Sequence, residues 1–454
     1  MNDTALILLQ GAVVIGAILL GVRTGGIGLG LWGLVGLAVL VFGFGLPPGS
    51  PPTSSMFIIL MVITAASTMQ AVGGIDYLVE VAKSLLKRKP AYIALIAPIV
   101  AFVFTLGAGT GFIYYSLIPV IYAVSYFNKV RPERPMAVAA TASQFAITAS
   151  PVSAAMAVMV GLLDPVGFGI TDILIVVIPA SIVGLVVACF VQMRVGKELD
   201  DDPEYQRRIE AGTIEPIDES VLATRELPPY AKRSTMIFLA GIAVIVVLGM
   251  FEGLRPVFPD ETGALVPLET SLVIQIVMGV TATVIVLTCR VKISKVVTQS
   301  TMTSGLVGLI ALFGIAWLAD TWIAANETSI VSAMGGLVEG ARWTIALAIF
   351  IVAALTTSQA AALSAIVPIG LALGIPPQFL AAFSVAAIGI YFFPANGSQV
   401  TSIATDETGT TKISKFAIWH SFSLSMFIMW IVSTVVAMVV AIALYGTSAA
   451  HVVP

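Results

Sequence analysis

The sequence predicts an all-α polytopic membrane protein made of two inverted repeats. Hydrophobic residues make up 58% of the 454 residues and charged residues only 10%, whereas a soluble domain carries about a quarter charged residues. Apolar runs of bilayer-spanning length recur along the whole chain. Polar segments broken by Gly, Ser or Pro interrupt such runs in both halves, and breaks of this kind occur at membrane depth only where they are buried in protein or line a cavity.

The apolar runs predict five full crossings and one re-entrant hairpin in each half. The hairpins, about 91–127 and 343–375, are interrupted midway, at Gly107–Gly111 and Thr356–Gln359. One crossing in each half, about 135–162 and 378–403, is expected to be a broken helix. We expect residues 1–193 to form the first repeat, 194–234 a cytoplasmic linker with a short helix near Pro203–Ala211, and 235–454 the second repeat. The other crossings are expected near 5–22, 25–45, 56–82, 171–193, 235–250, 270–288, 300–318 and 416–445.

Basic residues indicate the orientation. With this topology all but two of the 22 Lys and Arg residues fall on one side of the membrane, the exceptions being Arg255 and Arg342. Basic residues in short loops mark the cytoplasm, so both termini are predicted to lie outside it. An odd number of crossings per half inverts the second repeat relative to the first. The bias alone does not distinguish a hairpin from two crossings, but the interrupted midpoints favour hairpins.

The order of breaks is the same in both halves. In the first, Gly107–Gly111 leads to Pro119 and then to the broken segment Ala149–Pro151. In the second, Thr356–Gln359 leads to Pro368 and then to Phe393–Gly397. Paired breaks of this kind indicate a transporter's binding site. The alternative is that small residues simply let membrane helices pack closely.

The chemistry of these breaks suits an anion. The start of a half-helix presents unpaired N–H groups and a positive dipole end, and Ser, Thr, Asn and Gln add donors without fixed charge. No Lys or Arg falls inside a break. Two donor clusters facing one another would match a short molecule with a carboxylate at each end. Backbone carbonyls in such breaks also bind Na⁺, which makes cation coupling a candidate.

Other residues limit the functional class. Asp76 and Asp320 are the acidic residues nearest the membrane interior, at comparable places ahead of each hairpin, and are candidates for coupling to Na⁺ or H⁺. The alternative is that both lie at helix ends near water.

No nucleophile-and-base set indicates an enzyme, and the Gly107–Gly111 segment lacks the lysine of a phosphate-binding loop. Cys189 and Cys289 are interpreted as packing residues, and we expect no metal site and no cofactor.

Several ordered segments resemble the anaerobic C4-dicarboxylate transporter (Dcu) family. The resemblance implies exchange or uptake of fumarate, malate, aspartate and succinate across a bacterial inner membrane, so that the termini predicted from the basic residues to lie outside the cytoplasm would be periplasmic. Related families imply a homodimer in which a transport domain moves against a fixed scaffold, as in an elevator. The matching segments are Gly25–Gly30, Gly73–Leu78, Ala97–Val100, Gly107–Gly111, Ala146–Ala155, Asp201–Tyr205, Ala316–Thr321, Ser358–Ala361 and Asp406–Lys412.

We therefore expect a secondary transporter of C4-dicarboxylates that works by exchange, with the dicarboxylate, the lipid bilayer and a second copy of the chain as partners and no nucleic acid. The alternatives are a cation-coupled carrier for another small organic anion, a cation antiporter, and a receptor that binds without transport. The residues expected to surround the substrate are Gly109, Thr110, Gly111, Gln144, Thr148, Ser150, Thr357, Ser358, Gln359, Asn396 and Ser398.

Three departures from the family pattern lie at this proposed site. Phe112 stands where a polar Asn is expected, Thr357 stands where a Tyr is usual, and Pro394–Ser398 is more polar than its counterpart. The preferred dicarboxylate therefore stays open. The charges of Asp406–Lys412 favour a cytoplasmic loop over a wall of the site.

Overall fold

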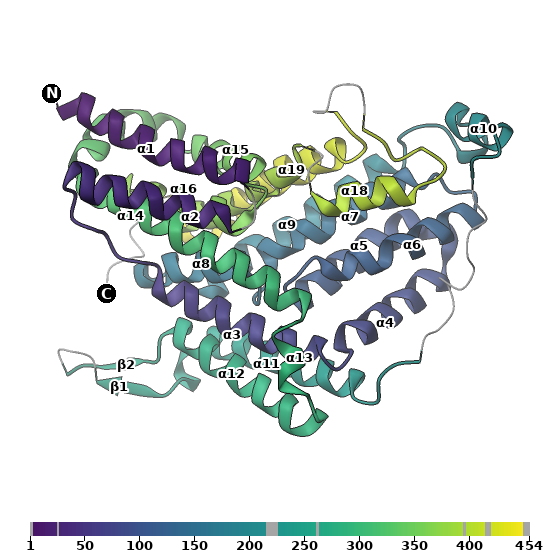
Figure 1. Ribbon diagram of the computed structural model, residues 1–454, viewed down its shortest axis with the longest axis horizontal. Coiled ribbons are helices and arrows are strands. Elements are labelled where there is room, and N and C mark those ends of the chain that lie inside the picture. The colour runs from purple at the N-terminus through teal and green to yellow at the C-terminus, as the bar shows by residue number, and fades with distance from the viewer. Residues whose placement is uncertain are drawn as a thin grey trace.

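The computed structural model describes residues 3–24, 27–214, 226–259, 263–393, 396–413 and 419–447, and these are mostly helical (Figure 1). Short 3₁₀ turns lie at Pro90–Tyr92, Asp164–Val166, Leu199–Asp201 and Glu252–Leu254. The helices of the first half and the linker are α1 (Asp3–Thr24), α2 (Gly28–Ala38, continued by a π-helical turn at Val39–Gly43), α3 (Thr53–Gln70), α4 (Gly74–Arg88), α5 (Ile93–Ala108), α6 (Phe112–Phe127), α7 (Glu133–Ala149), α8 (Ala154–Leu163), α9 (Ile170–Gln192) and α10 (Pro203–Glu210).

The second half adds one small β-hairpin to its helices. Strands β1 (Val257–Pro259) and β2 (Leu265–Pro267) are antiparallel, with Phe258 opposite Val266. The helices are α11 (Ala231–Met250), α12 (Thr270–Cys289), α13 (Ile293–Val296), α14 (Ser300–Ala341), α15 (Thr344–Thr356), α16 (Gln359–Ala372), α17 (Pro377–Phe383, continued by a 3₁₀ segment at Ser384–Tyr391), α18 (Gly397–Thr405) and α19 (Ser423–Tyr445). The short helix expected in the linker is confirmed as α10.

The lengths of the apolar helices confirm an all-α polytopic membrane protein. Among the described residues, six helical stretches are long and apolar enough to cross a membrane, and the bent pair α3–α4 would be a seventh. The six are α7 with α8, α9, α11, α12, the first part of α14, and α19. The remaining apolar helices are shorter, so the full set of ten crossings stays a prediction.

One expected crossing, 56–82, is bent rather than straight. It forms α3 and α4, whose axes differ by 70°. The bend occurs at Gly73, which has a φ of +83° and caps α4, a backbone conformation that favours glycine. A Cβ at this position would lie 2.7 Å from Cγ of Pro228, so close packing also requires glycine there.

Small residues let α2 and α14 cross at close range. A Cβ on Gly33 would lie 2.5 Å from the backbone carbon of Gly314, and one on Gly314 would lie 1.9 Å from the carbonyl oxygen of Gly30. Backbones that approach this closely require glycine on both helices. Gly30, which belongs to a segment that carries the family resemblance, therefore serves helix packing.

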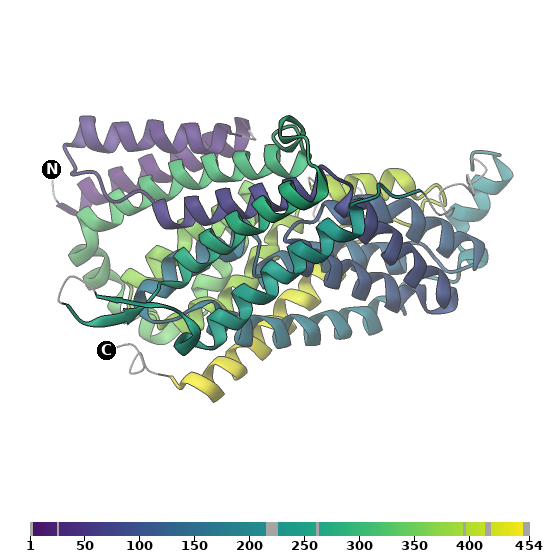
Figure 2. The ribbon, with the colours of Figure 1, turned by 90° about the horizontal axis from the view of Figure 1, so that it is seen from below.

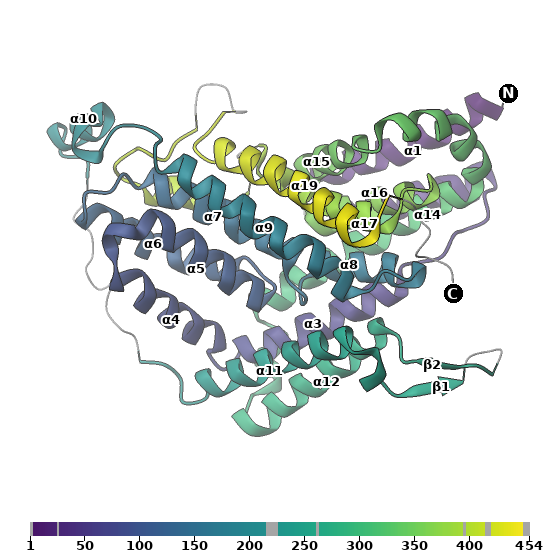
Figure 3. The same cartoon turned by 180° about the vertical axis from the view of Figure 1, so that it is seen from behind.

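Contacts between the halves occur in reciprocal pairs. Helix α2 packs on α14 while α12 packs on α3, and α6 packs on α18 while α16 packs on α8. Within each half a matching contact occurs: α5 packs on α7 in the first, and α15 packs on the 3₁₀ segment that continues α17 in the second. Helices α9 and α19 run side by side (Figure 3). The two halves are therefore interleaved rather than separate, and one hydrophobic core includes residues of both.

The β-hairpin projects beyond the ends of α11 and α12 (Figure 2). Arg255, one of the two basic residues expected on the outer side, lies at its base. Its guanidinium donates to the carbonyl oxygens of Leu248 at 3.0 Å and Leu268 at 3.1 Å. This side chain therefore joins the end of α11 to the strand leading into α12.

Candidate functional site

Each of the four breaks precedes the start of a helix in the structure. Helix α6 begins after Gly109–Gly111, α8 after Ser150–Ser153, α16 after Thr357–Ser358, and α18 after Asn396. We call residues 109–111 the first tip and 357–359 the second tip. A helix start leaves N–H groups without partners inside the helix, so each break supplies donors.

The first tip packs on the break between α7 and α8. Gly109 has a φ of +70°, and a Cβ there would lie 2.4 Å from the carbonyl oxygen of Val152. A Cβ on Gly111 would lie 2.4 Å from Nε2 of Gln144. Glycine is therefore required at 109, both for backbone conformation and for close approach to backbone, whereas at 111 the neighbour is the mobile end of a side chain.

Hydroxyl groups fix the break between α7 and α8. Ser150 donates to the carbonyl oxygen of Leu106 on α5 at 2.7 Å, and the Ser153 hydroxyl caps α8 by accepting from the Met156 N–H at 3.0 Å. Thr148 donates to the carbonyl oxygen of Phe145 on its own helix at 2.8 Å. Ser150 therefore ties the first hairpin to the broken helix, whereas Thr148 bonds within α7.

The second tip reaches the same helix. Thr357 has a φ of +50°, which is uncommon for a β-branched residue and marks a strained turn. Ser358 caps α16, its hydroxyl accepting from the Ala361 N–H at 3.3 Å. Nε2 of Gln359 then donates to the carbonyl oxygen of Gln144 at 2.7 Å. Both tips therefore meet at Gln144, which is buried on α7.

The break before α18 is fixed by a capping box. The Asn396 side chain accepts from the Ser398 N–H at 3.0 Å, and the Asn396 N–H donates to Oε1 of Gln399 at 3.2 Å. The Ser398 hydroxyl is hydrogen-bonded to the Tyr391 hydroxyl, which donates to the carbonyl oxygen of Ala140 at 3.1 Å. This break is therefore also anchored on α7. Pro394 and Ala395 lie outside the described residues.

Buried tyrosines are site components that the sequence interpretation missed. Tyr114 donates to the carbonyl oxygen of Met136, one turn from Ala140, and is hydrogen-bonded to Ser402, one turn from Ser398. Together with Tyr391, it docks α18 on α7 at two successive turns. A Cβ on Gly397 would lie 2.6 Å from the Tyr115 hydroxyl, so a third tyrosine lies at the start of α18. The only signal was their place, two to four residues from a break.

The structure thus brings the candidate residues onto α7 from three directions. Gly109, Gly111 and Gln359 contact or bond to the α7–α8 region directly, Ser150 bonds from that region to α5, and Ser398 reaches α7 through Tyr391. Thr110 lines a cavity of about 180 Å³ between the first tip and helices α3 and α14, together with Val152 and Thr301. Thr357 and Ser358 shape the second tip itself.

No fixed charge lies in this region. Residues 105–114, 141–154, 353–363 and 391–402 contain no Lys, Arg, Asp or Glu. The electrostatic character is therefore set by helix N-termini, each equivalent to about half a positive charge, and by neutral donors. This arrangement suits an anion that is bound and then released.

The two coupling candidates lie in different settings. Asp76 is exposed in the first turn of α4 and lines a 460 Å³ cavity with Glu80, Lys83 and Ser116. Asp320, on α14, accepts from the Ser50 N–H at 2.7 Å and so holds the segment that follows α2. The expected equivalence of the two carboxylates is not seen in their contacts, and a coupling role stays a prediction.

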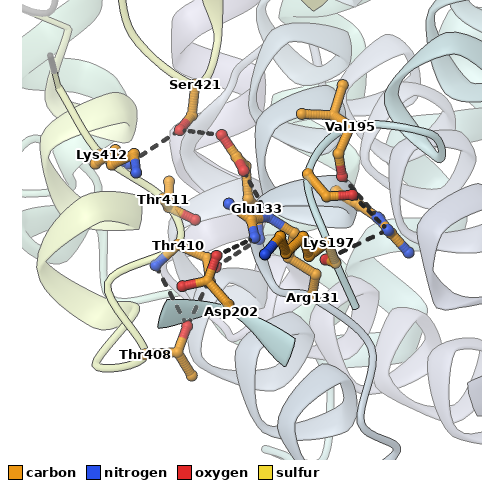
Figure 4. Close-up of polar contacts among 12 residues, drawn as sticks. Arg131, Glu133, Val195, Lys197, Asp202, Thr408, Thr410, Thr411, Lys412 and Ser421 are labelled. Carbon is orange, nitrogen blue, oxygen red and sulfur yellow. Dashed lines mark hydrogen bonds and ion pairs between the residues drawn. The ribbon is translucent and has the colours of Figure 1, made fainter. Parts of the chain in front are cut away.

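A second polar region, the polar clamp, consists of Arg131, Glu133, Asp202, Thr410 and Ser421 (Figure 4). Arg131 pairs with Glu133 at 2.7 Å and also with Asp202, which caps α10. Ser421 donates to the other Glu133 oxygen at 2.6 Å, and Thr410 accepts from the Glu133 N–H at 3.2 Å. The clamp joins the loop before α7, the start of the linker and the loop before α19.

Electrostatics in the clamp favour the charged forms. Burial alone would raise the pKa of the Asp202 carboxyl, but hydrogen bonds from Arg131 and the Tyr205 N–H outweigh it, so this pKa lies below its ordinary value. Burial would likewise lower the pKa of Arg131, but Glu133 and Asp202 raise it overall.

Segments 201–205 and 406–412, which carry part of the family resemblance, have their contacts in or beside the clamp rather than at the breaks.

Asp406 orders the loop beside the clamp. Its buried carboxylate accepts from the Thr411 N–H at 2.7 Å, the Thr410 hydroxyl at 2.8 Å and the Thr408 N–H at 3.0 Å. A carboxylate with several donors fixes a turn without a counter-ion. These contacts agree with the expectation of a loop.

Comparisons with known proteins agree on one family. A family model described as "Anaerobic c4-dicarboxylate membrane transporter" matches residues 6–445. The chain is 36% identical over 446 residues to the anaerobic C4-dicarboxylate transporter DcuB of Escherichia coli, covering 96% of this chain and 99% of that protein. It is 36% identical over 418 residues to the C4-dicarboxylate transporter DcuA of Wolinella succinogenes, covering 90% and 93% respectively.

Proposed function

The chain belongs to the anaerobic C4-dicarboxylate transporter family, and from this premise we propose that it exchanges fumarate, malate, succinate and aspartate across a bacterial inner membrane. The proteins to which it is similar are membrane transporters, not enzymes. The observation that carries the proposal is the meeting of both tips at Gln144, in a region of helix starts without fixed charge.

This geometry supports a ligand with two anionic ends. The first tip and α8 come from the first half, and the second tip and α18 come from the second half. Each pair supplies N–H donors that would stabilise a carboxylate. Because no Lys or Arg lies in the breaks, binding would be weaker than to a paired cation, and the substrate would be released more readily.

An elevator movement is the mechanism that we propose. The moving part would contain both hairpins, both broken helices, α9 and α19, all of which pack on one another or on α7. The fixed part would contain α1–α4 and α11–α14, and it would also form the contact between two copies in a homodimer. The cavity between the first tip, α3 and α14 lies at the boundary between these parts.

The reciprocal packing supports inverted repeats as part of this proposal. Exchanging α2 for α12, α3 for α14, α6 for α16 and α8 for α18 turns the α2–α14 contact into the α12–α3 contact and the α6–α18 contact into the α16–α8 contact. With the basic residues on the cytoplasmic side, both termini would be periplasmic. Proton or Na⁺ coupling through Asp76 or Asp320 belongs to the same proposal, and the alternatives are a cation-coupled carrier for another organic anion and a cation antiporter.

Counterflow of labelled fumarate into proteoliposomes tests the function. We expect unlabelled fumarate, malate, succinate or aspartate inside the vesicles to drive uptake, with and without Na⁺, and citrate or lactate to fail. Uptake driven by citrate or lactate alone would contradict the four-carbon assignment. Na⁺ or H⁺ flux that needs no dicarboxylate would favour the cation antiporter.

Two variants test the site within this assay. Ser358→Ala and Asn396→Ala each remove the side chain that caps a helix start, and we expect fumarate uptake to fall while the protein remains folded. Ser364→Ala is the matched control, because that hydroxyl donates to the carbonyl oxygen of Ala361 within α16. Unchanged kinetics in both cap variants would remove these residues from the site.

A further inference from the structure

The Gln359 side chain carries a buried acceptor that the structure leaves unpaired. Its Nε2 donates to the Gln144 carbonyl oxygen at 2.7 Å. A carbonyl only accepts hydrogen bonds, so this contact fixes which end of the amide is nitrogen. Oε1 is then the other end, and it is buried with no hydrogen-bond partner in the part of the chain that the structure describes. Buried acceptors without a partner are uncommon and call for an explanation.

The position of this oxygen is at the centre of the proposed site. Gln359 is the last residue of the second tip and the first residue of α16, and only 6% of it is exposed. The same Gln144 that it contacts lies against Gly111 of the first tip. Oε1 therefore lies beside the point at which both tips meet, where movement of a tip away from Gln144 would open it to substrate.

Three other candidate residues already use an acceptor. The Ser358 hydroxyl accepts from the Ala361 N–H, the Asn396 side chain accepts from the Ser398 N–H, and the Ser150 hydroxyl accepts from the Val152 N–H. These groups organise the breaks themselves. Gln359 differs because its acceptor remains available to a ligand.

We propose that Oε1 of Gln359 accepts a hydrogen bond from a donor on C2 of the substrate, and so selects among C4-dicarboxylates. The α-ammonium group of aspartate and the hydroxyl group of malate supply such a donor. Fumarate and succinate, as dianions, supply none and leave the oxygen unpaired. This inference rests on the proposed function, because it assigns one group within the same site.

A substrate series tests the inference without altering the protein. In counterflow with labelled fumarate, the competitors are L-aspartate, L-malate, succinate and 2-methylsuccinate. We expect aspartate and malate to compete about 10-fold more strongly than succinate, the ratio that one hydrogen bond typically supplies. 2-Methylsuccinate is the matched control, because its methyl group is about as large as the hydroxyl of malate but donates nothing. Equal competition by malate and 2-methylsuccinate would overturn the assignment.

Two variants make the test residue-specific. Gln359→Met keeps the length of the side chain and removes the amide, and we expect the advantage of aspartate and malate over succinate to disappear. A purely structural role would weaken all four competitors alike, which would also overturn the assignment. Gln359→Glu keeps an oxygen in place and adds negative charge. The ammonium group of aspartate is attracted to that charge, so aspartate should compete more strongly relative to malate than it does in the unmodified protein. This second variant decides the matter if the first does not fold, since an unchanged aspartate-to-malate ratio contradicts the inference.

The failure of this inference is distinguishable from failure of the proposed function. If the unmodified protein shows no fumarate counterflow, the transport proposal fails and this assignment fails with it. If fumarate counterflow occurs and the acids compete with it, but the Gln359 variants leave their competition ratios unchanged, only the assignment fails. Ser364→Ala serves as the control for general changes on α16.

Discussion

In the polar clamp, the buried Arg131 is paired with Glu133 and Asp202. Ser421 donates to the second carboxylate oxygen of Glu133, and Thr410 accepts from the Glu133 N–H. At the four breaks, by contrast, no charged side chain is present and donors come from helix starts and neutral groups. A buried charge with all its partners holds segments together but is costly to separate. Neutral donors bind more weakly and separate more easily. The difference suits a permanent joint in one region and a site that must open in the other.

The largest expected effect comes from breaking the clamp. Arg131→Met leaves two buried carboxylates without their counter-ion and should lower the free energy of unfolding by about 3–5 kcal/mol. Lys129→Met is the matched control, since Lys129 pairs with Asp200 while both side chains are about 60% exposed, and such pairs contribute about 0–1 kcal/mol. Thermal unfolding of the purified proteins measures both. Equal effects would show that the clamp is not a structural joint.

Next in size is a change at the first tip. Gly109→Ala adds a Cβ that would lie 2.4 Å from the Val152 carbonyl oxygen at a positive φ, and should cost about 1–3 kcal/mol with loss of fumarate counterflow. Gly107→Ala, two residues earlier, places its Cβ 3.6 Å from Leu239 and should change neither stability nor transport appreciably. If both variants transport normally, the close contact of the tip with the α7–α8 break is not required.

Lowering the pH should reduce the stability contributed by the clamp before it affects the four breaks. The pKa of Asp202 is lower in the folded protein than in the unfolded chain, so its stabilising contribution is present above the ordinary Asp pKa of about 3.9. That contribution is lost as the pH falls through the lower, folded value. We expect Asp202→Asn to unfold at a lower temperature than the unmodified protein at pH 7, with the difference shrinking below about pH 4. A constant difference across this range would exclude ionic pairing as its cause.

The smallest expected effect concerns the second tip. Thr357 adopts a φ of +50°, which Asn tolerates better than a β-branched residue. Thr357→Asn should raise the free energy of unfolding by less than about 1 kcal/mol and leave counterflow intact. A fall in transport without a change in stability would instead place the Thr357 side chain in contact with substrate.

The breaks were predictable because Gly, Ser, Thr and Pro stand out in apolar sequence, and Gly109 and Asn396 indeed cap helices. The role of the tyrosines was not predictable, because a tyrosine in an apolar run, such as Tyr114 or Tyr391, looks the same in the sequence whether its ring only packs or its hydroxyl also forms hydrogen bonds. The joining of Gln359 to Gln144 depends on tertiary structure across 215 positions of sequence. Arg131 was counted only as a marker of orientation, because its partner Asp202 lies 71 residues away. The bend at Gly73 had a local signal in the Gly73–Gly74 pair, which hydropathy alone does not reveal.

The way that Gln144 contacts the two tips has a consequence for evolution. It meets Gln359 through its backbone carbonyl, which every amino acid possesses, but it meets Gly111 through its side chain. Mutation at position 144 can therefore remodel the first tip while the hydrogen bond to the second tip persists. Among related proteins, a change at position 144 is therefore expected to alter the first tip while leaving the contact with the second tip in place.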